Sequence, residues 1–238
     1  MTTPPPRLLL IETSGQPGQV GLAEGSRLLQ AQTLSAARRH ARDLAPAVQQ
    51  LLQNVGWHPR DLQAVAVSRG PGSYTGLRVG IMSAKALAYA LQIPILAVDT
   101  FLILALQAGP GSDLDVLEDA QQEKIYVQRF RFLPGQSRPA ACQPLTIRPF
   151  SEWLTDLTTP LRVSGPALES ATFRARLPPT VSVVESALWH PQLPAMLDLA
   201  LDLWQRQEFA DTWRFEPLYL RPSEAEEAWE RRKPTARS

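Results

Sequence analysis

The sequence is poor in cysteine, with Cys142 as its single thiol among 238 residues. One thiol excludes an intrachain disulfide and a zinc site built from several cysteines, and it suits a reducing cytoplasm. Long apolar runs are also missing: Leu96–Leu106 is interrupted by Asp99, and a membrane span needs about 18 apolar residues or more. The proline-rich start, Met1–Arg7, has no apolar core of the kind a secretory signal needs. We therefore expect a soluble, cytoplasmic protein with no membrane partner.

Charge of one sign is not in excess either. The 24 Lys and Arg residues nearly balance the 23 Asp and Glu residues and leave a formal net charge of +1. No global field therefore attracts nucleic acid, and RNA is expected only through a local patch or another subunit. The one local cluster, Arg38, Arg39 and Arg42, also fits an ordinary solvated helix face.

The first half of the chain alternates strand and helix patterns. Short apolar runs predict buried strands at residues 8–11, 19–23, 27–33, 62–68 and 95–98. A stripe at helical spacing predicts a helix at about residues 36–55, with a kink or a late start at Pro46. A second helix is predicted at about residues 75–91.

The second half is less regular. Gly and Pro at residues 108–112 predict a domain boundary. Weaker strand patterns follow at residues 113–118, 124–132 and 141–147, and an amphipathic helix at residues 194–206. We expect a first α/β domain, a smaller second α/β domain and a charged flexible tail, at residues 1–108, 109–222 and 223–238.

A glycine-rich segment, Ser68–Gly80, joins a predicted strand to the second predicted helix. Its glycines permit positive φ or close backbone approach, Pro71 stiffens the turn, and Ser73 or Thr75 can cap the helix. Amides in this place can bind an anion, but a tight, capped connection explains the pattern as well. Neither P-loop nor Rossmann spacing is present. The motif residues are Arg69, Gly70, Pro71, Gly72, Ser73, Tyr74, Thr75, Gly76 and Arg78.

Small residues recur every four positions along the second predicted helix, at Gly76, Gly80, Ala84 and Ala88. Such a face lets another helix approach closely. It can meet a partner protein, or it can pack within the chain against the sheet or the first helix, and the two are compatible.

Together these motifs resemble the TsaB (YeaZ-type) family. The resemblance rests on Leu9–Ser14, Arg69–Gly80, Val98-Asp99-Thr100, His190-Pro191 and Pro217–Arg221, and it spans most of the chain. It implies an α/β, actin-like ATPase fold (ASKHA, RNase H-like), with two subdomains that each have a mixed sheet flanked by helices. It also implies a non-catalytic dimerisation or scaffold subunit of the tRNA N6-adenosine-37 threonylcarbamoyltransferase complex. Such a subunit binds and activates the catalytic relative TsaD as a heterodimer, while TsaE joins the full complex and tRNA is contacted indirectly.

The resemblance implies that the two predicted helices pair with the same helices of TsaD. A homodimer through the same surface is an alternative when TsaD is missing. A rival function is an independent small-molecule kinase or ATPase with the actin-like fold. The predicted interface consists of Leu44, Val48, Leu51, Leu52, Gly76, Gly80, Ala84 and Ala88.

No catalytic set and no metal site is expected. The catalytic relative carries two histidines four residues apart on a helix, whereas here His40 is followed by Leu44. One imidazole is a poor metal site, and the sequence has neither His-Glu-x-x-His nor Gly-x-Ser-x-Gly.

A vestigial nucleotide site is expected at Glu12, Thr13 and Ser14, where the family normally has Asp at the first position. The extra methylene moves the carboxylate by about 1.5 Å, enough to disturb water-mediated Mg²⁺ positioning. Pro166 removes an amide donor from the place of an adenosine loop, and Gln121 stands where the family often has Arg. We expect no tightly bound cofactor, with ATP or ADP and Mg²⁺ only at the joint between subunits.

Overall fold

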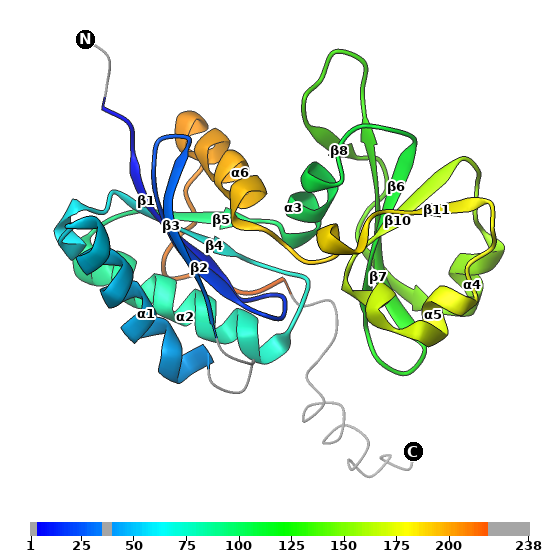
Figure 1. Cartoon of the computed structure of the whole chain (residues 1–238), viewed down its shortest axis with the longest axis horizontal. Helices are drawn as coiled ribbons and strands as arrows, with labels where there is room; N and C mark the ends of the chain where they lie inside the picture. The colour runs from blue at the N-terminus through cyan, green and yellow to red at the C-terminus, as the bar shows by residue number, and fades with distance from the viewer. Residues whose placement is uncertain (1–3, 35–39, 219–238) are drawn as a thin grey trace, which may run out of the picture.

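The first lobe is built on a five-stranded sheet of order β3-β2-β1-β4-β5 (Figure 1). The structure is a computed structural model that describes residues 4–34 and 40–218. β2 pairs antiparallel with β1 and β3, whereas β4 runs parallel to β1 and β5 parallel to β4. The strands are β1 (Arg7–Glu12), β2 (Gln19–Glu24), β3 (Arg27–Thr33), β4 (Ala64–Ser68) and β5 (Ile95–Val98). The strands predicted from the apolar runs are therefore confirmed.

Helices cover both faces of this sheet, which is why the runs that form β1 and β4 are apolar at every position rather than at every second one. α1 (His40–Val55) and α2 (Tyr74–Leu91) pack on one face. α3 (Thr100–Gln107) and α6 (Leu193–Arg206) pack on the other (Figure 1). Pro46 lies inside α1, so the helix begins well before it.

The second lobe repeats the scheme with shorter helices. Its sheet has the order β11-β10-β6-β7-β8, with β9 also paired to β7. Its strands are β6 (Asp113–Asp119), β7 (Lys124–Phe132), β8 (Pro139–Ala141), β9 (Thr146–Pro149), β10 (Leu161–Ser164) and β11 (Val181–Val183). α4 (Phe150–Thr155) and α5 (Ala171–Ala175) pack with this sheet. The single strand predicted at residues 141–147 is wrong, because two short strands flank Pro144, which has no amide to donate.

Both sheets have a central strand, β1 or β6, that pairs antiparallel with its neighbour on one side and parallel with its neighbour on the other. This duplicated mixed sheet flanked by helices is the actin-like fold, as predicted.

Two side chains fasten the connections between the lobes. Gln107 donates to the carbonyl oxygens of Leu188 (2.8 Å) and His190 (2.7 Å) and accepts from the Gln192 amide (3.1 Å). Arg162 donates to three carbonyl oxygens at the start of the second lobe, those of Ala108, Gly109 and Ser112. Hydrogen bonds from side chains thus fix both connections between the lobes.

The position of α6 differs from the predicted domain division. That division groups residues 193–206 with the second domain, but Leu193, Met196, Leu197 and Ala200 belong to the core of the first sheet. The chain therefore returns to the first lobe at its end. The boundary at residue 108 itself stays a prediction.

Candidate functional site

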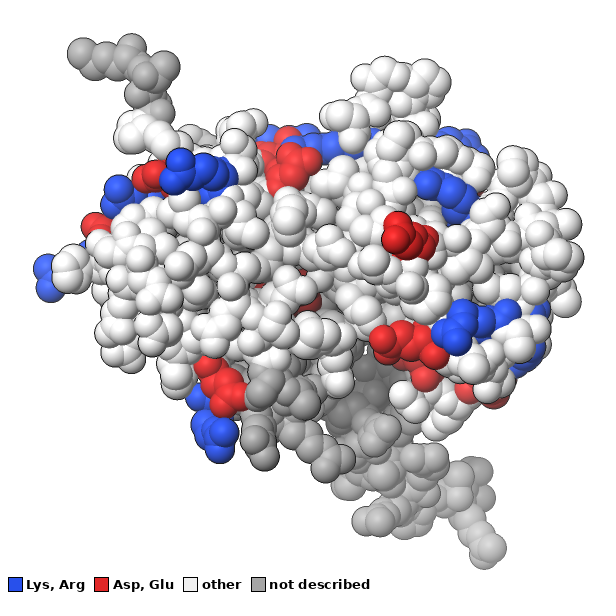
Figure 2. Space-filling view, in the orientation of Figure 1, with Lys and Arg blue, Asp and Glu red and all other residues white. Residues whose placement is uncertain are grey.

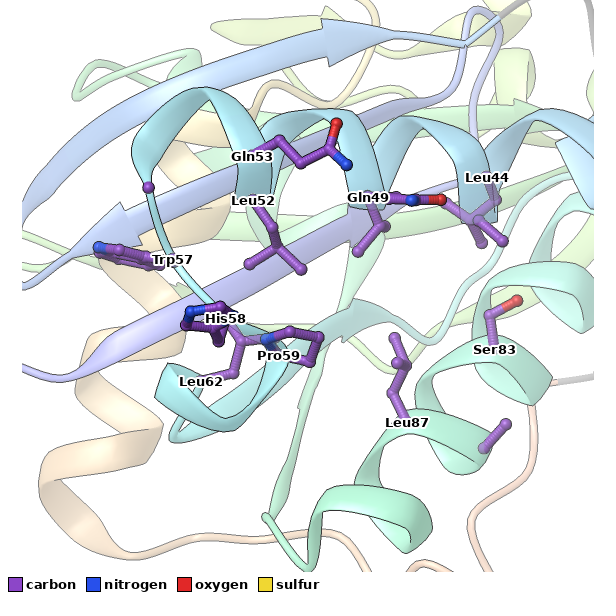
Figure 3. A pocket seen from close by; sticks show the side chains of 14 residues that line it. Leu44, Gln49, Leu52, Gln53, Trp57, His58, Pro59, Leu62, Ser83 and Leu87 are labelled. Carbon is purple, nitrogen blue, oxygen red and sulfur yellow. The ribbon is translucent and has the colours of Figure 1, made fainter.

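An apolar groove of about 910 Å³ lies between α1 and α2 (Figure 3). On the face that Figure 2 shows, the middle of the first lobe carries few charged side chains. Leu44, Val48 and Leu52 come from α1 and are almost fully buried, so they form the floor. Its other lining residues are Ala45, Gln49, Gln53, Gly56, Trp57, His58, Pro59, Leu62, Ser83, Ala86 and Leu87. A concave apolar surface of this size suits the side chains of a partner helix.

The groove exists because α2 carries small side chains on the side that faces α1. Ser83 and Ala86 are too short to fill the space above the α1 leucines, and Leu87 closes one end (Figure 3). At the other end Gly56, with φ of 74°, turns the chain out of α1. The Trp57 amide then donates to the Leu52 carbonyl oxygen at 2.9 Å, which fixes the far wall.

Large apolar side chains stand on the outer side of α2 beyond the groove. Met82 is 63% exposed and Tyr89 is 60% exposed. The Tyr89 ring meets the Trp213 ring edge-on, with centroids 5.4 Å apart. Lys85 donates to the carbonyl oxygens of Trp213 and Phe215, both at 3.1 Å, and ties that segment to the helix. Exposed aromatic and methionine side chains beside an apolar groove mark a protein-binding surface.

The small-residue face of α2 is turned into the chain, so the interface role predicted for it is wrong. A Cβ atom on Gly76 would lie 2.0 Å from the Thr13 carbonyl oxygen, and one on Gly80 would lie 2.1 Å from Thr13 Oγ1. Ala84 and Ala88 belong to the core between α2 and the first sheet. The pattern did predict close approach, but the neighbour is the end of β1 and not a partner helix.

The predicted α1 stripe divides between groove and core. Leu44, Val48 and Leu52 line the groove, whereas Leu51 contributes to the core beneath it. That these residues contact a partner stays a prediction.

The glycine-rich segment is a stiff connection between β4 and α2. Arg69 forms a two-pronged ion pair with Asp99, one bond of which measures 3.1 Å. The Ser73 amide donates to the Ser14 carbonyl oxygen at 2.8 Å, and Ser73 Oγ accepts from the Gly76 amide at 3.2 Å, so Ser73 caps α2. A Cβ atom on Gly72 would lie 2.5 Å from the Ser14 carbonyl oxygen. The segment therefore packs against the turn after β1.

The polar groups at the end of β1 form hydrogen bonds with one another, and the vestigial nucleotide site expected there stays a prediction. The Glu12 side chain is 1% exposed, and its Oε1 already accepts from the amides of Ser14 (2.6 Å) and Gly15 (3.3 Å). Burial raises the pKa of Glu12 above its usual value, although hydrogen bonds from Ser14, Ser68 and Gly15 oppose this. In the second lobe, a Cβ atom on Gly165 would lie 2.2 Å from the Leu117 carbonyl oxygen, so the segment before Pro166 is pressed onto β6.

Several predicted residues lie outside the part of the chain that the structure describes. Arg38 and Arg39 fall in the undescribed residues 35–39, and His40 begins α1 with a side chain outside the description. Arg42 is exposed and pairs with Asp43 at 3.2 Å. Within residues 4–34 and 40–218, no group of three or more His, Cys, Asp or Glu side chains is arranged to hold a metal ion. No helix in those same ranges has the length and apolarity to cross a bilayer.

Sequence reasoning missed the α2 half of the groove, namely Ser83, Ala86 and Leu87. Their signal was present, because Ala86 and Ala90 add a second set of small residues to the same helix, and both are exposed. Trp57, His58 and Pro59 were missed as well, since nothing in a lone aromatic after a helix indicates a groove wall.

Known proteins resemble this chain along most of its length. A family model described as TsaD, tRNA N6-adenosine threonylcarbamoyltransferase, matches residues 33–149, which contain both helices of the groove. A Bacillus subtilis relative named tRNA threonylcarbamoyladenosine biosynthesis protein TsaB is 29% identical over 226 residues, covering 93% of this chain and 97% of the relative. The solved structure of YeaZ from Pseudomonas aeruginosa matches with a TM-score of 0.75 and 27% identity, covering 90% of this chain and 100% of that one.

The chain is therefore similar to TsaB (YeaZ-type) proteins over most of its length.

The chain also shares a segment with a relative that is named as the transferase itself. It is 44% identical over 64 residues to a tRNA N6-adenosine threonylcarbamoyltransferase of Erythrobacter litoralis. That match covers 27% of this chain and 19% of the relative, so the similarity is local.

Proposed function

We propose that this chain acts in tRNA threonylcarbamoyladenosine biosynthesis as a non-catalytic subunit that binds and activates TsaD through the groove between α1 and α2. The biosynthetic role is supported by the name of its Bacillus subtilis relative. TsaD as the partner is supported by the TsaD family model over residues 33–149. TsaE and tRNA belong to the same assembly, but we expect neither of them to bind in this groove.

The observation that carries the proposal is the apolar groove itself. Both of its helices fall inside the segment that resembles TsaD, so TsaD is expected to offer a related pair of helices. Two related helix pairs can pack about a pseudo-twofold axis, each placing side chains in the groove of the other. The same argument allows a homodimer when TsaD is missing.

The chemistry of the groove describes the partner surface. Its floor is leucine and valine, so the partner must supply apolar side chains. Gln49 and Gln53 are exposed on the α1 side and offer amide groups rather than charges to the rim. Met82 and Tyr89 extend the contact along α2. A strongly charged partner helix does not match this surface.

The accessory role is supported by two positions at which this chain lacks the groups that catalytic relatives use to bind a metal or a nucleotide. Leu44 stands where the second histidine of a metal-binding pair is needed, and its side chain lies in the groove floor. The amides of Ser14 and Gly15, in the turn after β1, donate their hydrogen bonds to Glu12. We therefore assign the transfer chemistry to TsaD.

The test places a charge in the groove without touching the core. Ala86 is exposed on α2, so Ala86→Glu should fold normally but bury an unpaired carboxylate in the complex. Each variant is co-expressed with TsaD from the same cell, and the dissociation constant and the threonylcarbamoyladenosine content of tRNA are measured. We expect at least tenfold weaker binding and less modified tRNA.

Ala175→Glu is the matched control, because Ala175 is also an exposed alanine on a helix, α5, but in the second lobe. It should bind TsaD like the unmodified chain. Equal binding by Ala86→Glu and Ala175→Glu would rule out the groove as the TsaD surface.

A further inference from the structure

The turn after β1 contains its own hydrogen-bond acceptor. Glu12 is the last residue of β1, and its side chain folds forward over the three residues that follow. Its Oε1 accepts from the Ser14 amide (2.6 Å), the Ser14 hydroxyl and the Gly15 amide (3.3 Å). The Thr13 amide is directed elsewhere, to Ser68 Oγ at 3.4 Å. Three donors therefore converge on one carboxyl oxygen.

Converging donors of this kind normally bind an external anion. Successive backbone amides in a turn form a concave site for phosphate or carboxylate, and a nearby hydroxyl strengthens it. Here the accepting group is attached to the residue that begins the turn, so its local concentration far exceeds that of a dissolved anion. A free phosphate must displace it and leave a buried carboxyl without its donors.

The surroundings keep that carboxyl in place. On one side the Ser14 carbonyl oxygen accepts from the Ser73 amide, and Gly72 allows no side chain there. On the other side the Gly15 Cα faces Pro191, since a Cβ atom built on it would lie 3.1 Å from the Pro191 ring. The turn is enclosed by the glycine-rich segment and by the chain leading into α6.

A carboxyl group of the second lobe, that of Glu169, lies near the turn through its contact with His190. His190 Nδ1 lies 3.7 Å from the position of a Cβ on Gly15, and its Nε2 lies 2.7 Å from Glu169 Oε1. Glu118 lies close enough to Glu169 for that charge to contribute to its raised pKa. The Glu169 carboxylate on this side of the turn disfavours a second anion.

We propose that the Glu12 carboxyl group is a built-in acceptor that occupies the Ser14 and Gly15 donors in place of a phosphate, so that the donors of this turn are satisfied without nucleotide. Removal of the carboxyl group uncovers an anion site in this chain. The inference does not depend on the proposed function, because it holds whether or not the groove binds TsaD.

Inorganic phosphate is the probe for the first test. Calorimetry with phosphate, and separately with ATP and Mg²⁺, is performed on the full chain and on Glu12→Ala, Glu12→Gln and Glu24→Ala. We expect saturable phosphate binding by Glu12→Ala, with an association constant at least tenfold above that of the unmodified chain. Glu12→Gln keeps an acceptor of the same length and should bind no better than the unmodified chain.

Glu24→Ala is the control for loss of one carboxylate, because Glu24 ends the neighbouring strand β2 and pairs with Arg7. It should show no gain in phosphate binding. Phosphate should also raise the unfolding temperature of Glu12→Ala alone, because a ligand stabilises only the state that binds it.

A second readout covers the case in which Glu12→Ala does not fold. Amide hydrogen exchange at Ser14 and Gly15 is measured in the nucleotide-free unmodified chain and in Glu12→Gln. Both amides should be protected in both proteins. The proposal is overturned if the two amides exchange at unprotected rates, if the unmodified chain binds phosphate or ATP saturably, or if folded Glu12→Ala gains no phosphate binding.

Discussion

The two sides of α2 carry similar small residues but have different surroundings. The inner side presents Gly76, Gly80 and Ala84 to the end of β1 and the first sheet, with no room for a larger group. The outer side presents Ser83 and Ala86 to an open groove. Small residues at helical spacing therefore predict that another segment packs closely against the helix. They do not indicate which side of the helix contacts a partner protein.

The two sides of α2 differ because they have different neighbours. The inner side is fixed by atoms of the same chain, above all the carbonyl and hydroxyl oxygens of Thr13. The outer side leaves apolar surface on α1 and α2 uncovered, which is stable only if a partner covers it or if its area stays small. We therefore expect inner substitutions to change folding and outer substitutions to change binding.

The largest expected effect is on the inner side. Gly76→Ala places a Cβ 2.0 Å from a backbone oxygen, which cannot move aside as a side chain can. We expect a loss of at least about 3 kcal/mol in the free energy of unfolding, the upper range for overpacking. Urea denaturation of the purified chain measures it. Thr75→Ala, at the neighbouring exposed position, should stay within about 0.5 kcal/mol of the unmodified chain.

A matched pair two residues apart separates folding from binding most clearly. Ala84 is fully buried, so Ala84→Leu should cost about 1–3 kcal/mol through overpacking. Ala86 is exposed, so Ala86→Leu should leave stability within about 0.5 kcal/mol while it fills the groove and weakens TsaD binding. Thermal unfolding and pull-down with TsaD are measured on both. Similar stability losses in the two variants would contradict the assignment of the sides.

A smaller effect is expected at Lys85, which fastens residues 213–215 to α2. Lys85→Ala removes two hydrogen bonds to carbonyl oxygens, both of 3.1 Å. The expected loss in stability is about 1 kcal/mol, because bonds near the surface are largely replaced by water. Hydrogen exchange should become faster in residues 209–218 and stay unchanged in α1. A uniform increase over the first lobe would show instead that Lys85 supports the whole fold.

The last prediction concerns pH and two carboxyl groups, those of Glu12 on β1 and Glu118 on β6. Burial raises the pKa of Glu12 above 4.5, so the folded state favours the protonated form. Its contribution to stability is complete below pH 4.5 and is lost as pH rises through the raised pKa. Burial and the charges of Asp119 and Glu169 raise the pKa of Glu118 to about 8. The loss of stability with rising pH therefore continues to about pH 8.

The free energy of unfolding should therefore fall as pH rises from about 4.5 to 8. Glu12→Gln and Glu118→Gln should each flatten part of that decline, as measured by urea denaturation at successive pH values. Profiles parallel to that of the unmodified chain would contradict the raised pKa values.

Much of the fold could be predicted from the sequence. Runs such as Leu8–Ile11 are apolar at every position, which is the pattern of a strand buried on both faces, and the glycine-rich motif indicated the family. The side of α2 that faces outward could not be predicted, because both sides carry alanine and only the Thr13 contacts distinguish them. The place of α6 in the first lobe and the turn of the Glu12 side chain onto its own amides depend on contacts between distant or irregular segments, which periodicity does not report.

The most direct measurement of the central claim is amide hydrogen exchange of the full chain with and without TsaD. The account predicts slower exchange in α1 and in residues 82–90 when TsaD is added, with the second sheet unchanged. Unchanged exchange in α1 and α2, together with slower exchange in the second lobe, would place the partner elsewhere and contradict the account.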